Sequence, residues 1–276
     1  MKTLLKVENL DIAFRTEEAI VHAVRDVSFS VAAGRTLCIV GESGSGKSVT
    51  CHALLGLTPR NGRVRAGRIL FDGNDLRSLP EADMEKIRGR AISMVFQDPM
   101  SSLNPVHTIG QQIVESLKLH RGLTGNPATT EAKSLLDRVG IPEAAQRLRE
   151  YPHQLSGGMN QRAMIAMALA GQPRLLIADE PTTALDVTIQ AQILDLLRDL
   201  QSDLGMAIIF VTHDFGVVAE MADDVVVMRR GEVVEGDTAE QLLAHPSHPY
   251  TQELLRLVPR LDAPSPVYGN PAREAP

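Results

Sequence analysis

"TLCIVGESGSGKS", residues 36–48, joins a short apolar run to a glycine-rich loop that ends in lysine and serine. The apolar run at 36–40 predicts a strand buried on both faces, because continuous runs of this kind are typical of the centre of a parallel sheet. The loop at 41–48 satisfies the pattern G-x-x-x-x-G-K-[ST] and stands between this strand and a predicted helix, the setting in which the pattern binds phosphate. The stretch therefore predicts an α/β fold built around a phosphate-binding loop, the P-loop.

The residue types of the P-loop suit a nucleoside triphosphate. Glycines let backbone N–H groups wrap the phosphates, Lys47 adds a positive charge toward the β and γ phosphates, and the Ser48 hydroxyl is a ligand for Mg²⁺. A purely structural turn is the alternative, and the position between strand and helix disfavours it. The loop residues expected to hold the nucleotide are Gly41, Ser43, Gly44, Ser45, Gly46, Lys47 and Ser48.

Two further apolar runs predict neighbouring strands of the same parallel sheet. They are "RLLIADE" at 174–180 and "MAIIFVTHD" at 206–214. The segment between them predicts a helix that ends at Gly205. Its apolar residues fall on one face and indicate a strand-helix-strand crossover; they are Ile189, Ile193, Leu196, Leu197, Leu200 and Leu204.

Polar side chains follow the predicted strands at the edge where parallel strands place ligands. Asp179 is positioned for Mg²⁺, directly or through water, and Glu180 for polarising the attacking water as a general base. Gln97 and His213 each follow another apolar strand and are expected to sense the γ-phosphate, with Gln97 joining Ser48 and Asp179 as a Mg²⁺ ligand. The alternative for these four strand-end residues is a solvated, hydrogen-bonded rim.

The rest of the chain predicts two additions to this mostly parallel P-loop NTPase core. Alternating segments before and after the P-loop, such as "LKVENLDIAF" and "GRILFDGNDL", predict an N-terminal antiparallel β layer. Helical periodicity dominates from about 100 to 172 and predicts an inserted helical subdomain. We expect residues 1–258 to form one nucleotide-binding domain and 259–276, with five prolines, to form an extended or disordered tail.

Composition excludes several other classes of protein. The chain has 276 residues and a formal charge of −6, with no lysine or arginine block, which argues against nucleic acid as a partner. Cys38 and Cys51 stand in apolar surroundings and are expected to be buried free thiols. The first residues do not resemble an export signal, and the longest apolar stretch, 163–170, is far shorter than the ~20 residues that cross a bilayer. If the protein works at a membrane, another chain crosses it.

A second phosphate-binding pattern lies in "YPHQLSGGMNQR", residues 151–162. A serine and two glycines directly ahead of a helix leave first-turn N–H groups free for an anion, although an ordinary capped helix is the alternative. The P-loop already supplies one complete phosphate site. Ser156, Gly157 and Gly158 are therefore predicted to close over the nucleotide of another subunit.

The order of these motifs resembles the nucleotide-binding subunit of ATP-binding cassette (ABC) transporters along nearly the whole chain. The motifs are the P-loop, Gln97, "LSGGMNQ", "LLIADE", "ALD" and His213. The resemblance implies ATP and Mg²⁺ as ligands. It also implies a head-to-tail dimer in which residues 156–158 reach the γ-phosphate of the partner subunit. Asp186 matches a loop that crosses the dimer seam in this family, and Phe14 stands where an aromatic ring stacks on adenine, with core packing as the alternative.

Longer stretches are similar to ATPases of di- and oligopeptide importers, a group that includes nickel, glutathione and opine systems. They are "VFQDPMSSLNPVHTIGQQI", "EYPHQLSGGM", "ADEPTTALDVTIQAQIL" and "HPYTQELL". This similarity implies a homo- or heterodimer with a second ABC ATPase, two transmembrane permease subunits and, indirectly, a solute-binding protein. It also implies peripheral attachment to the cytoplasmic face of the inner membrane.

Two departures and two other protein classes limit this resemblance. Asn160 stands where relatives commonly carry arginine, and the tail lacks the cysteines that hold an iron–sulfur cluster in some of them. A soluble cassette ATPase of DNA repair has a long insertion between the motifs, whereas Gln97 and Ser156 are only 59 positions apart. A P-loop kinase or GTPase leaves "LSGGM" without a role, and the chain has no NKxD motif for guanine.

Overall fold

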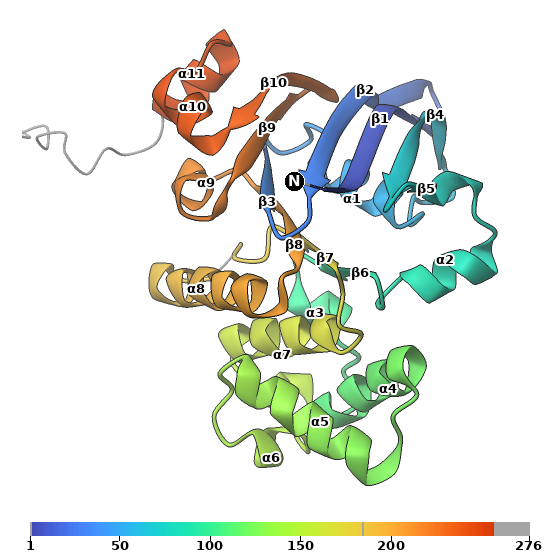
Figure 1. Cartoon of the computed structure of the whole chain (residues 1–276), viewed down its shortest axis with the longest axis vertical. Helices are drawn as coiled ribbons and strands as arrows, with labels where there is room; N and C mark the ends of the chain where they lie inside the picture. The colour runs from blue at the N-terminus through green and yellow to red at the C-terminus, as the bar shows by residue number, and fades with distance from the viewer. Residues whose placement is uncertain (1, 184, 257–276) are drawn as a thin grey trace, which may run out of the picture.

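The structure is a computed structural model that describes residues 2–183 and 185–256, and the predicted tail at 259–276 lies outside them. Its strands form a four-stranded sheet of order β2-β1-β4-β5 and a six-stranded sheet of order β10-β9-β3-β8-β7-β6. Figure 1 shows the smaller sheet at one end of the molecule and a group of helices, α3 to α7, at the other. The predicted fold class is confirmed.

The smaller sheet is the predicted antiparallel layer. It consists of β1 (Thr3–Arg15), β2 (Ile20–Ala32), β4 (Gly62–Phe71) and the short β5 (Asn74–Asp75), and each neighbouring pair is antiparallel. Its alternating apolar side chains cover one face of the larger sheet together with α1 (Lys47–Leu54). The 3₁₀ turn Leu76–Ser78 and α2 (Glu81–Ile87) then lead the chain to the larger sheet.

The larger sheet is parallel except at one edge. Parallel pairing joins β9 (Asp224–Arg229), β3 (Thr36–Val40), β8 (Ala207–Thr212), β7 (Leu175–Asp179) and β6 (Ile92–Val95), while β10 (Glu232–Thr238) forms an antiparallel hairpin with β9. β3 sends Leu37 and Ile39 into the core beneath the antiparallel layer, and Cys38 and Val40 into the core beneath the helices. The strand is thus buried on both faces, as its apolar run predicts.

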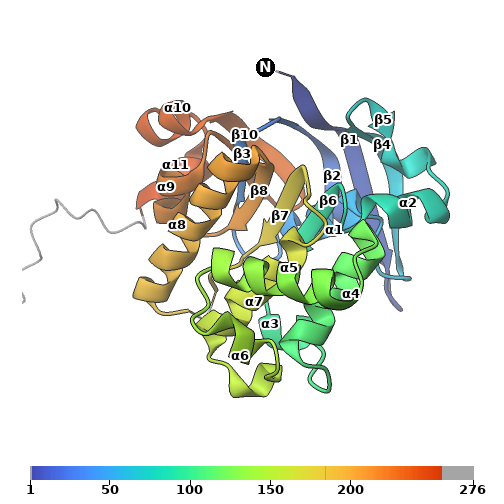
Figure 2. The same cartoon turned by 60° about the horizontal axis from the view of Figure 1, so that its bottom comes forward.

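The helical part follows β6 in the chain. It contains α3 (Pro99–Ser102), α4 (Ile109–Arg121), α5 (Gly125–Arg138), α6 (Ala144–Arg147), the 3₁₀ turn Pro152–Gln154 and α7 (Gly157–Leu169). Figure 2 shows these helices together in front of the larger sheet. Apolar residues of α4, α5 and α7 belong to the same core cluster as the helix-covered face of that sheet. The part is therefore packed onto the core.

The predicted crossover helix is α8 (Val187–Leu204), which joins β7 to its parallel neighbour β8. Ile193, Leu197 and Leu200 are buried, and Gly205 ends the helix in the left-handed conformation. Leu204 falls on the same predicted face, and its side chain is exposed. Residues 202–205 are all exposed. The last turn of the helix therefore extends beyond the core, although the apolar pattern of the sequence continues through it.

The C-terminal elements return to the larger sheet. α9 (Phe215–Met221) precedes β9, and α10 (Ala239–Ala244) and α11 (Pro249–Arg256) follow β10. Cys38 and Cys51 are buried free thiols, as predicted. Within the described ranges, no helix has the length and apolar character needed to span a bilayer.

Truncating α8 should separate its buried face from its exposed end. Ile193→Ala should lower the free energy of unfolding by about 2–4 kcal/mol because it removes a fully buried side chain. Leu204→Ala is the control on the same helix, and it should change that free energy by less than about 0.5 kcal/mol. Urea unfolding measures both variants. Equal losses would contradict the placement of the helix.

Candidate nucleotide-binding site

A cavity of about 530 Å³ lies at the carboxyl ends of the central parallel strands. The P-loop forms one wall after β3, and Gln97, Glu180 and His213, which follow β6, β7 and β8, line the opposite side. Because β8 lies between β3 and β7, the sheet order brings these segments to one edge. The structure therefore brings three of the four strand-end residues that the sequence singled out to this cavity, while Asp179, the last residue of β7, does not line it.

Two glycines let the P-loop lie directly against its neighbours. Gly41 has φ 151°, and a Cβ there would lie 2.1 Å from the carbonyl oxygen of Met228 on β9. Gly46 has φ 103°, and its Cβ would lie 2.6 Å from the carbonyl oxygen of Ala23 on β2. Gly46 is also the N-cap of α1 and provides no side-chain cap, so the first-turn N–H groups face the cavity as an anion site.

Lys47 holds a buried positive charge beside this anion site. Its side chain is only 4% exposed, and its Nζ donates to the carbonyl oxygens of Gly41 at 2.7 Å and Glu42 at 2.9 Å. Glu180 Oε1 lies 3.9 Å from the same Nζ. Burial lowers the pKa of Lys47, while the negative charges of Glu180 and Asp179 oppose that shift.

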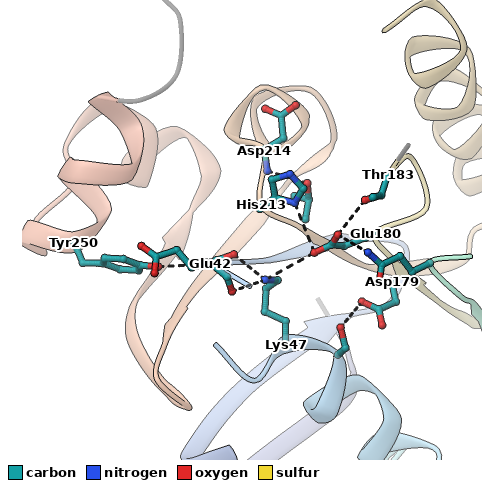
Figure 3. A network of polar contacts seen from close by, with 12 residues as sticks. Glu42, Lys47, Asp179, Glu180, Thr183, His213, Asp214 and Tyr250 are labelled. Atoms are coloured by element: carbon teal, nitrogen blue, oxygen red, sulfur yellow. Dashed lines mark hydrogen bonds and ion pairs between the residues drawn. The ribbon is translucent and has the colours of Figure 1, made fainter. Parts of the chain in front are cut away.

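Glu180 lies at the centre of the polar network in Figure 3. Its Oε2 accepts hydrogen bonds from Gln97 Nε2 at 3.1 Å and Thr183 Oγ1 at 3.0 Å, and its Oε1 lies 3.6 Å from His213 Nδ1. Its backbone has φ 46°, in the left-handed region that is strained for a side chain of this size. Sequence reasoning missed Thr183; its only signal is a hydroxyl three residues after the carboxylate.

Ser48 and Asp179 place two oxygen atoms side by side below the cavity. Ser48 Oγ donates to Asp179 Oδ1 at 2.9 Å, and burial raises the pKa of Asp179. A hydroxyl and a carboxylate are ligands that Mg²⁺ prefers, so this pair fits that ion. Gln97, the third predicted Mg²⁺ ligand, donates from its amide nitrogen to Glu180, and this bond leaves its amide oxygen available as the ligand atom. The described residues contain no cluster of three or more His, Cys, Asp or Glu arranged for a metal.

The second phosphate-binding pattern does not line this cavity. Ser156 caps α7 by accepting a hydrogen bond from the N–H of Met159 at 3.3 Å. Gly157 has no positive φ, and a Cβ there would meet no atom within 4 Å, whereas a Cβ on Gly158 would lie 2.9 Å from Ile189 Cγ2. Only Gly158 is therefore required by packing within the chain.

Two other predicted contact residues also lie outside the cavity. Asp186 is exposed and caps α8, since its carboxylate accepts the N–H of Ile189 at 2.9 Å. Phe14 lines a separate cavity with Arg15, Ile20 and Arg60, and its ring packs against the core beneath the antiparallel layer. The structure thus separates Phe14 from the phosphate site.

Asn160, the departure noted in the second pattern, is buried on α7. Its Nδ2 donates to the carbonyl oxygens of Pro152 at 2.9 Å and Leu155 at 3.4 Å. These bonds tie the helix to the segment that precedes Ser156. The asparagine is therefore an internal link within the chain.

Two family models match the chain. The model described as "ABC transporter" matches residues 24–183, and the model described as "Oligopeptide/dipeptide transporter, C-terminal region" matches residues 234–276.

Similar curated proteins include two importer ATPases. The oligopeptide transport ATP-binding protein OppD of Haemophilus influenzae is 54% identical over 262 residues, which cover 95% of this chain and 81% of OppD. The glutathione import ATP-binding protein GsiA of Salmonella typhimurium is 54% identical over 268 residues, and the chain spans only 43% of that protein.

Similar solved structures are also ATP-binding cassettes. A dimeric post-hydrolysis state of the cassette MJ0796 bound to ADP and Pi matches with a TM-score of 0.77 and 29% identity, covering 86% of this chain and 99% of that one. The structure of cbiO1 from Clostridium perfringens, part of the ABC transporter complex cbiONQ, matches with a TM-score of 0.75 and 28% identity. It covers 89% of this chain and 92% of cbiO1.

The two glycines after Ser156 should differ in their effect on stability. Gly158→Ala should lower the free energy of unfolding by about 1–3 kcal/mol, because its Cβ crowds Ile189. Gly157→Ala should cause no loss, since its Cβ meets open space and alanine favours a helix. Thermal unfolding of both variants measures the difference. A loss at Gly157 as large as that at Gly158 would show that the isolated chain itself requires glycine there.

Proposed function

This chain belongs to the ABC transporter family as an ATP-hydrolysing subunit, and we propose that it drives the import of di- or oligopeptides. The observation that carries the choice of cargo is the match of residues 234–276 to the oligopeptide/dipeptide C-terminal region. The similarity to OppD over most of the length of both proteins supports it. Glutathione import is the second candidate, because GsiA has the same 54% identity to this chain over its matched part as OppD has. Glutathione is itself a small peptide.

The nucleotide in this proposal binds with its phosphates on the P-loop. The supporting features are the free first-turn N–H groups of α1 and the buried charge of Lys47. Ser45 is kept as a loop residue of this proposal, although its side chain does not line the cavity. Ser48 and Asp179 would hold Mg²⁺, which neutralises charge on the β and γ oxygens when it is bound. Phe14 is proposed to stack on adenine, a role that requires the base to reach the second cavity.

Hydrolysis is assigned to the residues around Glu180. Its carboxylate takes a proton from a water molecule as the oxygen of that water attacks the γ-phosphorus, and ADP leaves as the bond to the β–γ bridging oxygen breaks. Thr183 and Gln97 orient the carboxylate through its Oε2. His213, close to Oε1, contacts the γ-phosphate in this proposal.

The site is completed by a second ABC ATPase, either another copy of this chain or a paralogue. We assign Ser156, Gly157 and Gly158 to the γ-phosphate bound by that partner, and Asp186 to the seam between the subunits. The open space at Gly157 supports this assignment, because close approach by another molecule explains a glycine that the fold does not need. The similar cassette MJ0796 is dimeric with ADP and Pi.

Two transmembrane permease subunits and, indirectly, a solute-binding protein complete the proposed importer. The chain would sit on the cytoplasmic face of the membrane. Exposed apolar side chains beside Gln97 in the chain support a docking surface for the permeases; they are Phe96 and Met100, exposed by 37% and 53%. The charge of −6 gives no support to nucleic acid as a partner.

Glu180→Gln should uncouple ATP binding from hydrolysis and transport. The amide keeps the size of the side chain but removes the base, so hydrolysis should fall by roughly 10²–10⁴-fold while ATP stays bound. Cells that rely on this variant should lose uptake of labelled oligopeptides. If the wild-type chain supports uptake of glutathione and not of oligopeptides, the second candidate replaces the first.

The same variant also tests the role of residues 156–158. With Mg-ATP, Glu180→Gln should accumulate as closed dimers with itself or with its paralogue, and light scattering detects them. Adding Ser156→Arg should abolish the dimers but leave ATP binding to the monomer intact, because the cation lies at the partner's phosphate. A double variant that dimerises as well as Glu180→Gln would leave Ser156 as a helix cap only.

A further inference from the structure

A tyrosine from the C-terminal part of the chain reaches the P-loop. Tyr250 lies on α11, is only 2% exposed, and accepts a hydrogen bond through its hydroxyl oxygen from the backbone N–H of Glu42 at 3.2 Å. Figure 3 shows Tyr250 on one side of Glu42 and Lys47, and Glu180 on the other. Tyr250 lies outside the "ABC transporter" match at 24–183 and inside the oligopeptide/dipeptide match at 234–276. The contact therefore joins a group-specific segment to the common nucleotide site.

The Gly41–Glu42 peptide group is held from both sides. Its N–H donates to Tyr250, and its carbonyl oxygen accepts a hydrogen bond from Lys47 Nζ at 2.7 Å. Hydrogen bonds at the two ends of one peptide group polarise each other and fix its orientation. The phenol thus acts on the same peptide group that positions the phosphate-binding ammonium.

Tyr250 is itself fixed by neighbours that do not face the nucleotide cavity. The guanidinium of Arg229 lies 4.5 Å above the centre of its ring. Glu235 on β10 accepts hydrogen bonds from the backbone N–H of Ser247 at 2.7 Å and of His248 at 3.2 Å, and His248 Nδ1 accepts the N–H of Tyr250 at 3.1 Å. These contacts explain the "HPSHPY" stretch as a turn that seats the tyrosine.

Burial raises the pKa of the Tyr250 phenol, so the hydroxyl stays protonated at neutral pH. The same helix also approaches the front of the site, because Leu254 lines the P-loop cavity. α11 therefore contacts the loop from behind and borders the space in which the nucleotide is proposed to lie.

We propose that Tyr250 is a positioning residue for the P-loop, through which the segment 232–256 sets the affinity for nucleotide. The inference rests on the proposed nucleotide site and adds to it a determinant from outside the segment that the "ABC transporter" model matches. Its effect reaches the phosphates through the loop and Lys47, and because ATP and ADP share the β phosphate, both nucleotides lose affinity. The groups around Glu180 follow other strands, so the rate of hydrolysis at saturating ATP is nearly independent of Tyr250.

Tyr250→Phe is the direct test, because it keeps the buried ring and removes only the oxygen that accepts the Glu42 N–H. Titration calorimetry on the full chain with Mg-ADP and Mg-ATP should give dissociation constants raised about three- to tenfold, since a peptide N–H loses its partner. The KM for ATP should rise in parallel, with kcat nearly unchanged. Leu242→Val is the control, since Leu242 is buried on α10 and does not line the P-loop cavity. It should lower the melting temperature without changing either dissociation constant.

Each outcome decides between a positioning role and a packing role. Wild-type affinity in Tyr250→Phe, or an equal loss in Leu242→Val, overturns the proposal and leaves Tyr250 as a core residue. A fall in kcat at unchanged KM also overturns it. If the wild-type chain binds neither nucleotide, the proposed function fails. If the wild-type chain and Tyr250→Phe bind nucleotide equally well, only the proposed role of Tyr250 fails.

Discussion

The buried ammonium of Lys47 imposes the constraint on which the rest of the structure depends. An isolated charge of this kind costs several kcal/mol to bury unless hydrogen-bond acceptors and opposite charges surround it. The carbonyl oxygens of Gly41 and Glu42 supply the acceptors, and the carboxylates of Asp179 and Glu180 at the end of β7 supply the charges. The loop lies directly against β9 and β2 because Gly41 and Gly46 have no side chains there. The sheet order then places β7 across from the loop. The fold and the site therefore both depend on how the buried charge of Lys47 is compensated.

The site is divided among three parts of the molecule. The first part is the cavity itself, in which the P-loop forms one wall and the strand-end residues form the other. The side chains of the two walls are in contact through Glu180. The Ser156 segment presents its helix start to solvent on the helical part and does not line the P-loop cavity of its own chain. The C-terminal segment supports the P-loop from behind through Tyr250. In the proposed dimer, a nucleotide in the cavity of one subunit also contacts the Ser156 segment of the other.

Local sequence patterns predicted the centre of the fold well. The continuous apolar composition of β3, β7 and β8 is enough to predict that these strands are buried. The glycines of the P-loop are likewise enough to predict its turn. Contacts between distant segments were not predictable in the same way. Tyr250 and Glu42 are 208 positions apart, and no periodicity relates them. The exposure of Leu204 and the separation of Phe14 from the phosphate cavity likewise depend on where a neighbouring element ends, which a local pattern does not contain.

In the proposed dimer, the P-loop of one subunit and the Ser156 segment of the other form each complete site. Chains carrying Lys47→Ala and chains carrying Ser156→Arg can be mixed with Mg-ATP, and mixed pairs can be captured through two different tags. The account predicts that each variant alone is inactive and that captured mixed pairs hydrolyse ATP. Each mixed pair combines both defects in one site and leaves the other site intact. Captured mixed pairs that remain inactive, while the Ser156→Arg chain still binds ATP, would contradict the account.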